Sequence, residues 1–242
     1  MQGMESLREL FKIGCGPSSS HTMGPERACK LFGEQHPEAT AFRVTLYGSL
    51  AKTGKGHCTD EVIRKMLAPA PCEVIFDDTA TDLPHPNTMD IIGLRDGVEI
   101  GRARVLSVGG GSIAFENQQV TRPDLVYKEH TFSDIAALCK ERSIRLWEYA
   151  AENEGEGFWE HMDSVWAAMK QAIGRGLADE GILPGGLSVK KKARSLYRNQ
   201  HIDESAETRE NRMVCAFAFA VSEQNASGEQ IVTAPTCGAA GV

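Results

Sequence analysis

The hydrophobic pattern of this 242-residue chain changes its period near residue 130. Before that point, short runs rich in Val, Ile and Leu are separated by glycine clusters, which is typical of strands joined by turns. The clearest runs are 43–50, 72–78 and 98–108. Fourteen of the 24 glycines precede residue 115, so this part of the chain also carries most of the turn signals. The change of period predicts two differently built parts.

Helices are expected between the strands of the first part. Gly24-Pro25 favours a helix start that continues to about Phe32, because proline is tolerated in the first helical turn. A second helix is predicted from Thr59, as its N-cap, to about Leu67. Asp96-Gly97 lies between two strand-like runs and predicts a tight hairpin. Residues 1–130 are therefore expected to form an α+β domain with a mixed sheet and helices.

The second part is predicted to be helical almost throughout. In residues 157–178 apolar side chains recur every three or four positions, which indicates one long amphipathic helix. The segment ENRMVCAFAFAVSEQNASG predicts another helix, which is apolar on several faces and is therefore expected to be deeply buried. Residues 131–144 are interpreted as a boundary, and residues 145–242 as the start of an all-α domain.

Charge and hydropathy exclude several classes of protein. With 26 basic and 33 acidic residues the formal charge is −7, whereas a general nucleic-acid binder normally has a basic excess. No apolar run approaches the roughly 20 residues that span a bilayer. The N-terminal stretch MQGMESLRELFKIG lacks the features of a signal peptide. These observations predict a cytoplasmic protein with no membrane or nucleic-acid partner.

The seven cysteines form no local metal-binding pattern. Their number is odd and no CxxC pair occurs, so neither a disulfide framework nor a zinc knuckle is indicated. We therefore expect separate thiols in a reducing compartment. Spacing alone also allows a cluster that is assembled from cysteines distant in sequence. The cysteines are Cys15, Cys29, Cys58, Cys72, Cys139, Cys215 and Cys237.

The strongest local signal for a binding site is GCGPSSSHTMGP, residues 14–25. Three serines and a histidine precede a predicted helix start, where free backbone N–H groups and the helix dipole favour an anion. Ser18, Ser19, Ser20 and His21 could therefore cradle a carboxylate. A capping turn with an incidental histidine would have the same sequence, so both readings stay open.

The segment GSLAKTGKGHCTDE, residues 48–61, has the glycines of a phosphate loop but the wrong spacing, and Gly56 replaces the hydroxyl residue that would hold magnesium. What remains is a glycine turn that carries Lys55 and His57 between a strand and a helix. A histidine in such a turn can act as a general base, or it can be structural. Asn87 and Thr88, in LPHPNTMD, could likewise position a substrate or form a plain turn.

Four segments of the chain, taken in order, closely resemble motifs of the bacterial iron–sulfur L-serine dehydratases. They are GPSSSHTMGP, YGSLAKTGKGHCTDE, HPNTM and SVGGGSI. Four later segments resemble the start of that family's catalytic α domain. They are LWEYAAENE, VWAAMKQAIGRGL, GILPGGLSVKKKA and IVTAPTCGAAG. The resemblance implies that residues 1–130 form a β domain related to allosteric substrate-binding domains. It also implies dehydration and deamination of L-serine to pyruvate and ammonia, a step in amino-acid catabolism and gluconeogenesis.

The resemblance also assigns roles to residues. It implies that His57 is the base and that Ser18, Ser19, Ser20 and His21 orient the substrate. Lys55, Asn87 and Thr88 are weaker candidates for the same pocket. A 4Fe-4S cluster is implied as the Lewis acid, and none of the seven cysteines falls on a ligand position of the family.

The sequence stops at Val242 inside the motif IVTAPTCGAAG. The ligand cysteines are therefore expected beyond residue 242, and the chain is interpreted as an incomplete form that is inactive when isolated. The alternative is a cluster-free module that binds serine or another small carboxylate and acts only with a separate α chain. A homo-oligomer is expected in the first case.

Overall fold

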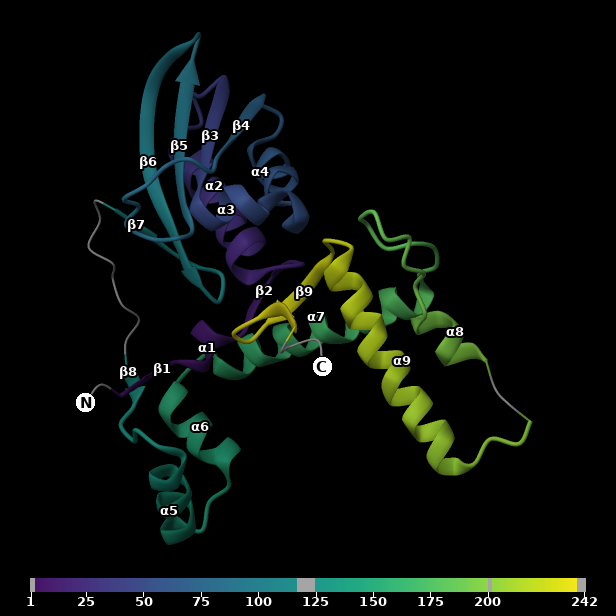
Figure 1. The fold of residues 1–242 in the computed structure, drawn as a ribbon. Coiled ribbons are helices and arrows are strands. Elements are labelled where there is room, and N and C mark those ends of the chain that lie inside the picture. Colours follow the sequence, from purple (N-terminus) through teal and green to yellow (C-terminus); the bar gives the residue numbers. More distant parts are fainter. Residues whose placement is uncertain (1–2, 117–124, 200–201, 239–242) are drawn as a thin grey trace.

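The computed structural model describes residues 3–116, 125–199 and 202–238. A sheet with covering helices forms the N-terminal part, and long helices form most of the rest (Figure 1). The predicted change of architecture is thus confirmed. None of the helices in these ranges is long and apolar enough to cross a membrane.

A mixed five-stranded sheet is the centre of the N-terminal part, with strand order β4-β3-β5-β6-β7. β3 pairs with β4 in parallel, and the other neighbours pair antiparallel. The predicted turn at Asp96-Gly97 is confirmed, since Arg95 pairs with Val98 across it. The strands are β3 (Ala41–Tyr47), β4 (Cys72–Asp77), β5 (Thr88–Arg95), β6 (Val98–Gly109) and β7 (Ser112–Phe115).

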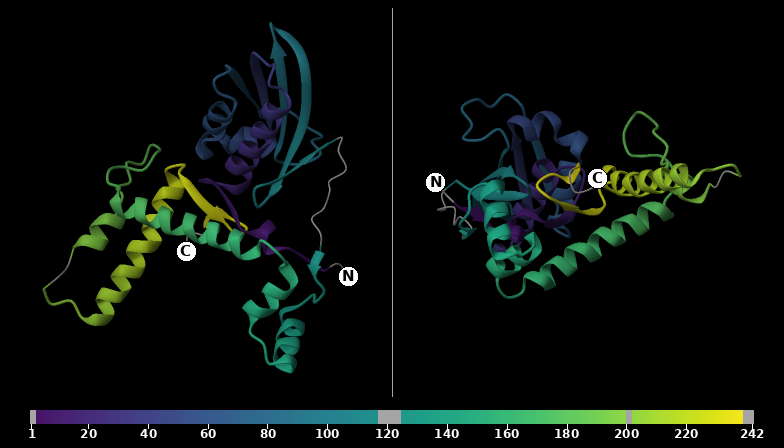
Figure 2. Two further views of the ribbon diagram at one scale, coloured as in Figure 1. Left: turned by 180° about the vertical axis from the view of Figure 1, so that it is seen from behind. Right: turned by 90° about the horizontal axis from the view of Figure 1, so that it is seen from below.

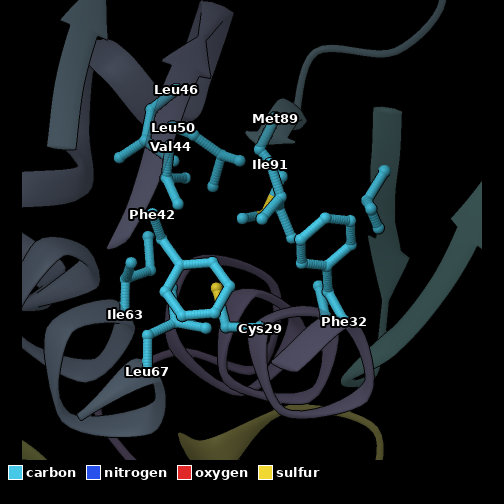
Figure 3. Close-up of a cluster of buried hydrophobic side chains, with 12 residues drawn as sticks. Cys29, Phe32, Phe42, Val44, Leu46, Leu50, Ile63, Leu67, Met89 and Ile91 are labelled. Carbon is cyan, nitrogen blue, oxygen red and sulfur yellow. The ribbon is translucent and has the colours of Figure 1, made fainter. Parts of the chain in front are cut away.

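Two helices, α2 (Gly24–Gln35) and α4 (Thr59–Leu67), pack together against this sheet. Alternate residues of β3 face them, and Figure 3 shows the resulting core, in which Phe32 of α2 and Ile63 of α4 lie among the strand side chains. Fully burying an aliphatic or aromatic side chain contributes about 1.5–3 kcal/mol, so this core holds the helices on the sheet.

Two local predictions differ from the structure. The strand expected over 43–50 ends at Tyr47, because Gly48 has φ +52° and turns the chain into α3 (Gly48–Thr53). A 3₁₀ helix, η2 (Gly54–His57), follows. Thr59 was expected as an N-cap, but Cys58 occupies that position and Thr59 is the first helical residue. The Thr59 hydroxyl instead donates a hydrogen bond to the carbonyl of His21, in the serine-rich loop.

The C-terminal part contains five helices in the described residues. The long helix predicted over 157–178 is confirmed as α7, and α8 and α9 pack against it. α5 and α6 contact each other and lie at the other end of α7 (Figures 1 and 2). The helices are α5 (Phe132–Arg142), α6 (Leu146–Glu154), α7 (Phe158–Ala178), α8 (Ala193–Arg198) and α9 (Ala206–Ala226).

The expectation that α9 is deeply buried is wrong for its large side chains. Val214 is 61% exposed, and Phe217 and Phe219 are 38% and 39% exposed. The fully buried apolar positions of α9 are the small residues Ala216 and Ala220. Small side chains let two helices approach closely, so the packed face of α9 is its alanine face.

Two short antiparallel ladders join segments that are distant in sequence. β1 (Met4–Glu5) pairs with β8 (Leu125–Tyr127), and a single helical turn, α1 (Leu7–Leu10), follows β1. β2 (Lys12–Cys15) pairs with β9 (Gln230–Thr233), so that Gly14 lies opposite Ile231. The C-terminal part is therefore not purely helical, and it shares a ladder with the N-terminal part (Figure 1).

The α7–α9 contact predicts opposite effects for two glycines of the same helix. A Cβ at Gly176 would lie 2.3 Å from the backbone oxygen of Ala220, whereas a Cβ at Gly174 would meet no atom within 4 Å. Gly176→Ala is expected to lower the free energy of unfolding by about 1–3 kcal/mol through overpacking. Gly174→Ala is expected to raise it by about 0.5–1 kcal/mol through helix propensity. Urea denaturation of both variants tests this, and equal effects would contradict the close crossing.

Candidate functional site

The serine-rich loop forms an unusual helix start. β2 leads through a cis Gly16–Pro17 bond into a π-helical turn, η1 (Ser19–Met23), which continues as α2. Ser18 is its N-cap, and the Ser18 hydroxyl accepts a hydrogen bond from the backbone N–H of His21 at 3.1 Å. Single π-helical turns are frequent at functional sites. Ser18 therefore caps this helix, which agrees with one of the two readings of the loop left open by the sequence.

The second histidine lies on the neighbouring loop. His57 is the last residue of η2, and Cys58 after it has φ 53°, a left-handed conformation that is uncommon for a residue with a side chain. Two hydroxyls join the loops reciprocally. Thr22 donates to the carbonyl of His57 at 2.9 Å, and Thr59 donates to the carbonyl of His21 at 2.6 Å. These bonds fix the two histidine backbones relative to each other.

The histidine rings consequently lie side by side, with centroids 4.8 Å apart and an interplanar angle of 46°. Both ring nitrogens of His21 have a hydroxyl partner, since Nδ1 lies 3.0 Å from Ser20 Oγ and Nε2 lies 2.9 Å from Ser49 Oγ. Burial and the neighbouring His57 lower the pKa of His21, and the contact with Ser49 partly offsets this. His21 is thus held in a fixed orientation and is mainly neutral at pH 7.

The His57 ring is less constrained. Within the described residues its ring nitrogens have no hydrogen-bond partner, and the side chain is only half-buried. A histidine with a free ring nitrogen beside a neutral histidine can accept a proton from a bound molecule. The pair therefore offers one fixed polar ring and one ring that is available for proton transfer.

The remaining candidates fall into two groups. Asn87 reaches the serine loop through Ser107: the Asn87 amide donates to the Ser107 carbonyl at 3.4 Å, and the Ser107 hydroxyl donates to the carbonyl of Ser20 at 2.7 Å. Asn87 Oδ1 is buried without a hydrogen-bond partner in the described part of the chain. A buried acceptor of this kind is costly unless a ligand or water supplies a donor.

Three of the predicted residues do not contact the histidine pair through their side chains: Ser19, Thr88 and Lys55. Ser19 is 8% exposed. Thr88 is fully buried, and its hydroxyl donates to the carbonyl of His85 at 2.6 Å. Lys55 is exposed, and its ammonium lies 5.4 Å from the centre of the Phe76 ring. The structure thus brings Ser18, Ser20, His21, His57 and Asn87 together, while the Ser19 side chain is buried and those of Thr88 and Lys55 contact other groups.

Three contributors to this site were not predicted from the sequence. Ser49 and Ser107 bind the His21 loop, although both lie in motifs already singled out, GSLAKTGKGH and SVGGGSI. The third is the C-terminal segment, where Cys237 Sγ lies 3.7 Å from Met23 Sδ at the end of η1. The β2–β9 ladder places that segment there, and no local pattern could have indicated the pairing.

The seven cysteines do not form a cluster site. All are free, and Cys29 and Cys139 are buried in separate apolar cores. Burial raises the pKa of the Cys72 thiol to about 11, which disfavours the thiolate that binds metal. Within the described residues, which include every cysteine, no group of three or more His, Cys, Asp or Glu side chains could hold a metal ion.

Two protein-family models match the chain. The family model described as serine dehydratase beta chain matches residues 6–73, and the one described as serine dehydratase alpha chain matches residues 89–242. The second match begins within β5, so strands from both matched ranges form the five-stranded sheet.

Similar curated proteins carry the corresponding name. The chain is 33% identical to L-serine dehydratase of Haemophilus influenzae and to L-serine dehydratase 2 of Escherichia coli. It is 30% identical to L-serine dehydratase of Streptomyces coelicolor. These alignments cover 98–99% of the chain and 64% of each relative, so the chain spans about 64% of the length of these relatives. The chain belongs to the serine dehydratase family.

Proposed function

We propose that this chain carries the proton-transfer and substrate-orienting residues of an L-serine ammonia-lyase. The reaction breaks the Cα–H and Cβ–O bonds of L-serine and releases water and aminoacrylate. Aminoacrylate tautomerises to an imine, which water hydrolyses to pyruvate and ammonia. The observation that supports the proposal most directly is the His21–His57 ring pair, whose two loops are joined by hydrogen bonds from Thr22 and Thr59. The chain also belongs to a family whose curated relatives are named for this substrate.

His57 is the proposed base. Its ring nitrogens have no hydrogen-bond partner among the described residues, so one of them can take the Cα proton as the electron pair moves into the new C=C bond. The neighbouring His21 supports this role because its lowered pKa keeps it neutral. A neutral neighbour does not oppose the positive charge that His57 gains when it accepts the proton.

His21 and the serine loop are proposed to orient the substrate. The Ser20 hydroxyl and the His21 ring form one hydrogen-bonded unit, and Ser18 fixes its backbone. The free Oδ1 of Asn87 is suited to accept a hydrogen bond from the substrate ammonium group. Ser19 and Thr88 are proposed to act through the backbone of these loops, and Lys55 through the charge that it adds near the η2 turn.

A 4Fe-4S cluster, when bound, would supply the Lewis acid that helps hydroxide to leave. The described cysteines do not fit such a cluster, so no step above is assigned to it. The alternative function, a serine-binding module that acts only with a separate α chain, is less well supported. Both the beta-chain and the alpha-chain family models match this one chain.

A product assay tests the proposal. The protein as its gene encodes it is purified without oxygen, supplied with iron and sulfide, and given L-serine. We expect pyruvate and ammonia in equal amounts, measured by coupled NADH oxidation. D-serine, whose Cα–H bond points away from a base placed for L-serine, should give no product. A folded, cluster-loaded protein that forms no pyruvate from L-serine would contradict the proposed reaction.

A further inference from the structure

A hollow of about 480 Å³ is lined by residues of α1, β2, α2 and α7. Neither His21 nor His57 lines it. Basic side chains from three elements line it: Arg8 is on α1, Lys12 is on β2, and Arg27 and Lys30 are on α2. His161 and Ser164 complete the wall from the first turns of α7.

The charge of this lining is opposite to that of the chain. It contains four basic side chains and two carboxylates, whereas the whole protein has a formal charge of −7. Both carboxylates are already engaged. Glu9 lies 3.9 Å from the Lys12 ammonium, and Glu26 accepts a hydrogen bond from the backbone N–H of Cys15 at 3.3 Å. Clustered positive charge in a concavity attracts anions.

Two cations of the hollow have no ion-pair partner among the described residues, and two buried nitrogen atoms have no hydrogen bond there. Arg27 and Lys30 are exposed, and they form no salt bridge with any residue that the structure describes. Arg8 Nε and His161 Nε2 are buried without a hydrogen bond in the same part of the chain, although Arg8 Nε lies 4.0 Å from the Glu154 carboxylate and forms an ion pair with it. Lys12 is partly desolvated, which lowers its pKa, and its ammonium donates to Ser112. A buried donor without a partner has a free-energy cost that a bound oxyanion would remove.

We propose that this hollow binds a small oxyanion with two negative charges, either a phosphate group or a dicarboxylate. Arg27 and Lys30 supply two cations on one side, separated by one helical turn, and His161 supplies a ring nitrogen on the other. Lys12 and Met23, which flank the serine loop on both sides, also line the hollow. The bound ion therefore connects helix α7 with both ends of the loop that contains His21.

Calorimetric titration of the protein with inorganic phosphate, and separately with succinate, at constant ionic strength tests this site. We expect saturable binding of at least one of the two, and the preferred ion distinguishes a phosphate ligand from a dicarboxylate ligand. In the double variant Arg27→Gln/Lys30→Gln the affinity should fall at least tenfold. Both residues are exposed, so the variant is expected to fold normally.

The matched control is Lys52→Gln/Lys140→Gln, which changes the net charge equally at exposed positions outside the hollow. Its affinity should equal that of the unmodified protein. The inference is overturned if neither ion binds, or if the two double variants lose affinity to the same extent. Because the readout is binding, the outcome is independent of whether L-serine is the substrate.

Discussion

Replacing His57 by alanine should lower kcat for L-serine about 100- to 10,000-fold, the range typical of losing a positioned general base. The His57 ring has no hydrogen-bond partner among the described residues, so its removal should leave the fold intact. The backbone bond from Thr22 to the His57 carbonyl does not depend on the side chain. Steady-state assays of pyruvate formation, with circular dichroism as a check on folding, measure the effect.

Imidazole added to the His57→Ala variant should restore part of the activity, because a small base can enter the space that the ring leaves. A residue with a merely structural role would show no such rescue. Lys52→Ala is the control, since Lys52 is exposed on α3 in the same segment. Turnover of His57→Ala within a few-fold of the unmodified protein would remove His57 from the mechanism.

The second large effect is expected for stability, at Glu154. The side chain of this glutamate is fully buried, and it accepts hydrogen bonds from Ser6 Oγ at 2.5 Å, from the backbone N–H of Leu7 at 2.6 Å and from Tyr127 Oη at 2.6 Å. Glu154→Ala leaves these three donors without their acceptor. Removing one member of a buried, charged hydrogen-bond network typically costs about 3–5 kcal/mol, and a loss of about this size in unfolding free energy is expected.

Glu152→Ala is a matched control on the same helix. Glu152 forms an ion pair with Arg142, but both side chains are nearly half exposed, so its loss should cost no more than about 1 kcal/mol. Thermal and urea denaturation measure both variants. Equal destabilisation by the two substitutions would show that the Glu154 hydrogen bonds do not hold the N-terminal segment against α6.

The stability that Glu154 provides should also depend on pH. Burial alone would raise the pKa of Glu154, but the hydrogen bonds from Ser6, Tyr127 and Leu7 outweigh it and lower the pKa. The folded state therefore favours the carboxylate more than the unfolded state does. This contribution is complete above the unfolded pKa of about 4.3 and is lost as the pH falls through the lower folded value.

Local sequence patterns predicted the elements that depend on short-range physics. The α7 stripe and the turn at Asp96-Gly97 are confirmed, because apolar periodicity and turn chemistry are set by neighbouring residues. The end of β3 and the exposed face of α9 were not predicted correctly. At Gly48 the backbone turns into α3, and in α9 the alanine face rather than the phenylalanine face packs inward.

The candidate site divides in the same way. The sequence by itself identified the serine loop and the histidine turn as chemically unusual, and the family resemblance gave them roles. Only the tertiary structure decided that His21 and His57 lie 4.8 Å apart and that Ser49 holds the His21 ring. It also decided that β9, more than 200 residues away, supports the loop through β2. Contacts between distant segments depend on how whole elements pack, and a local pattern of residues does not encode that packing.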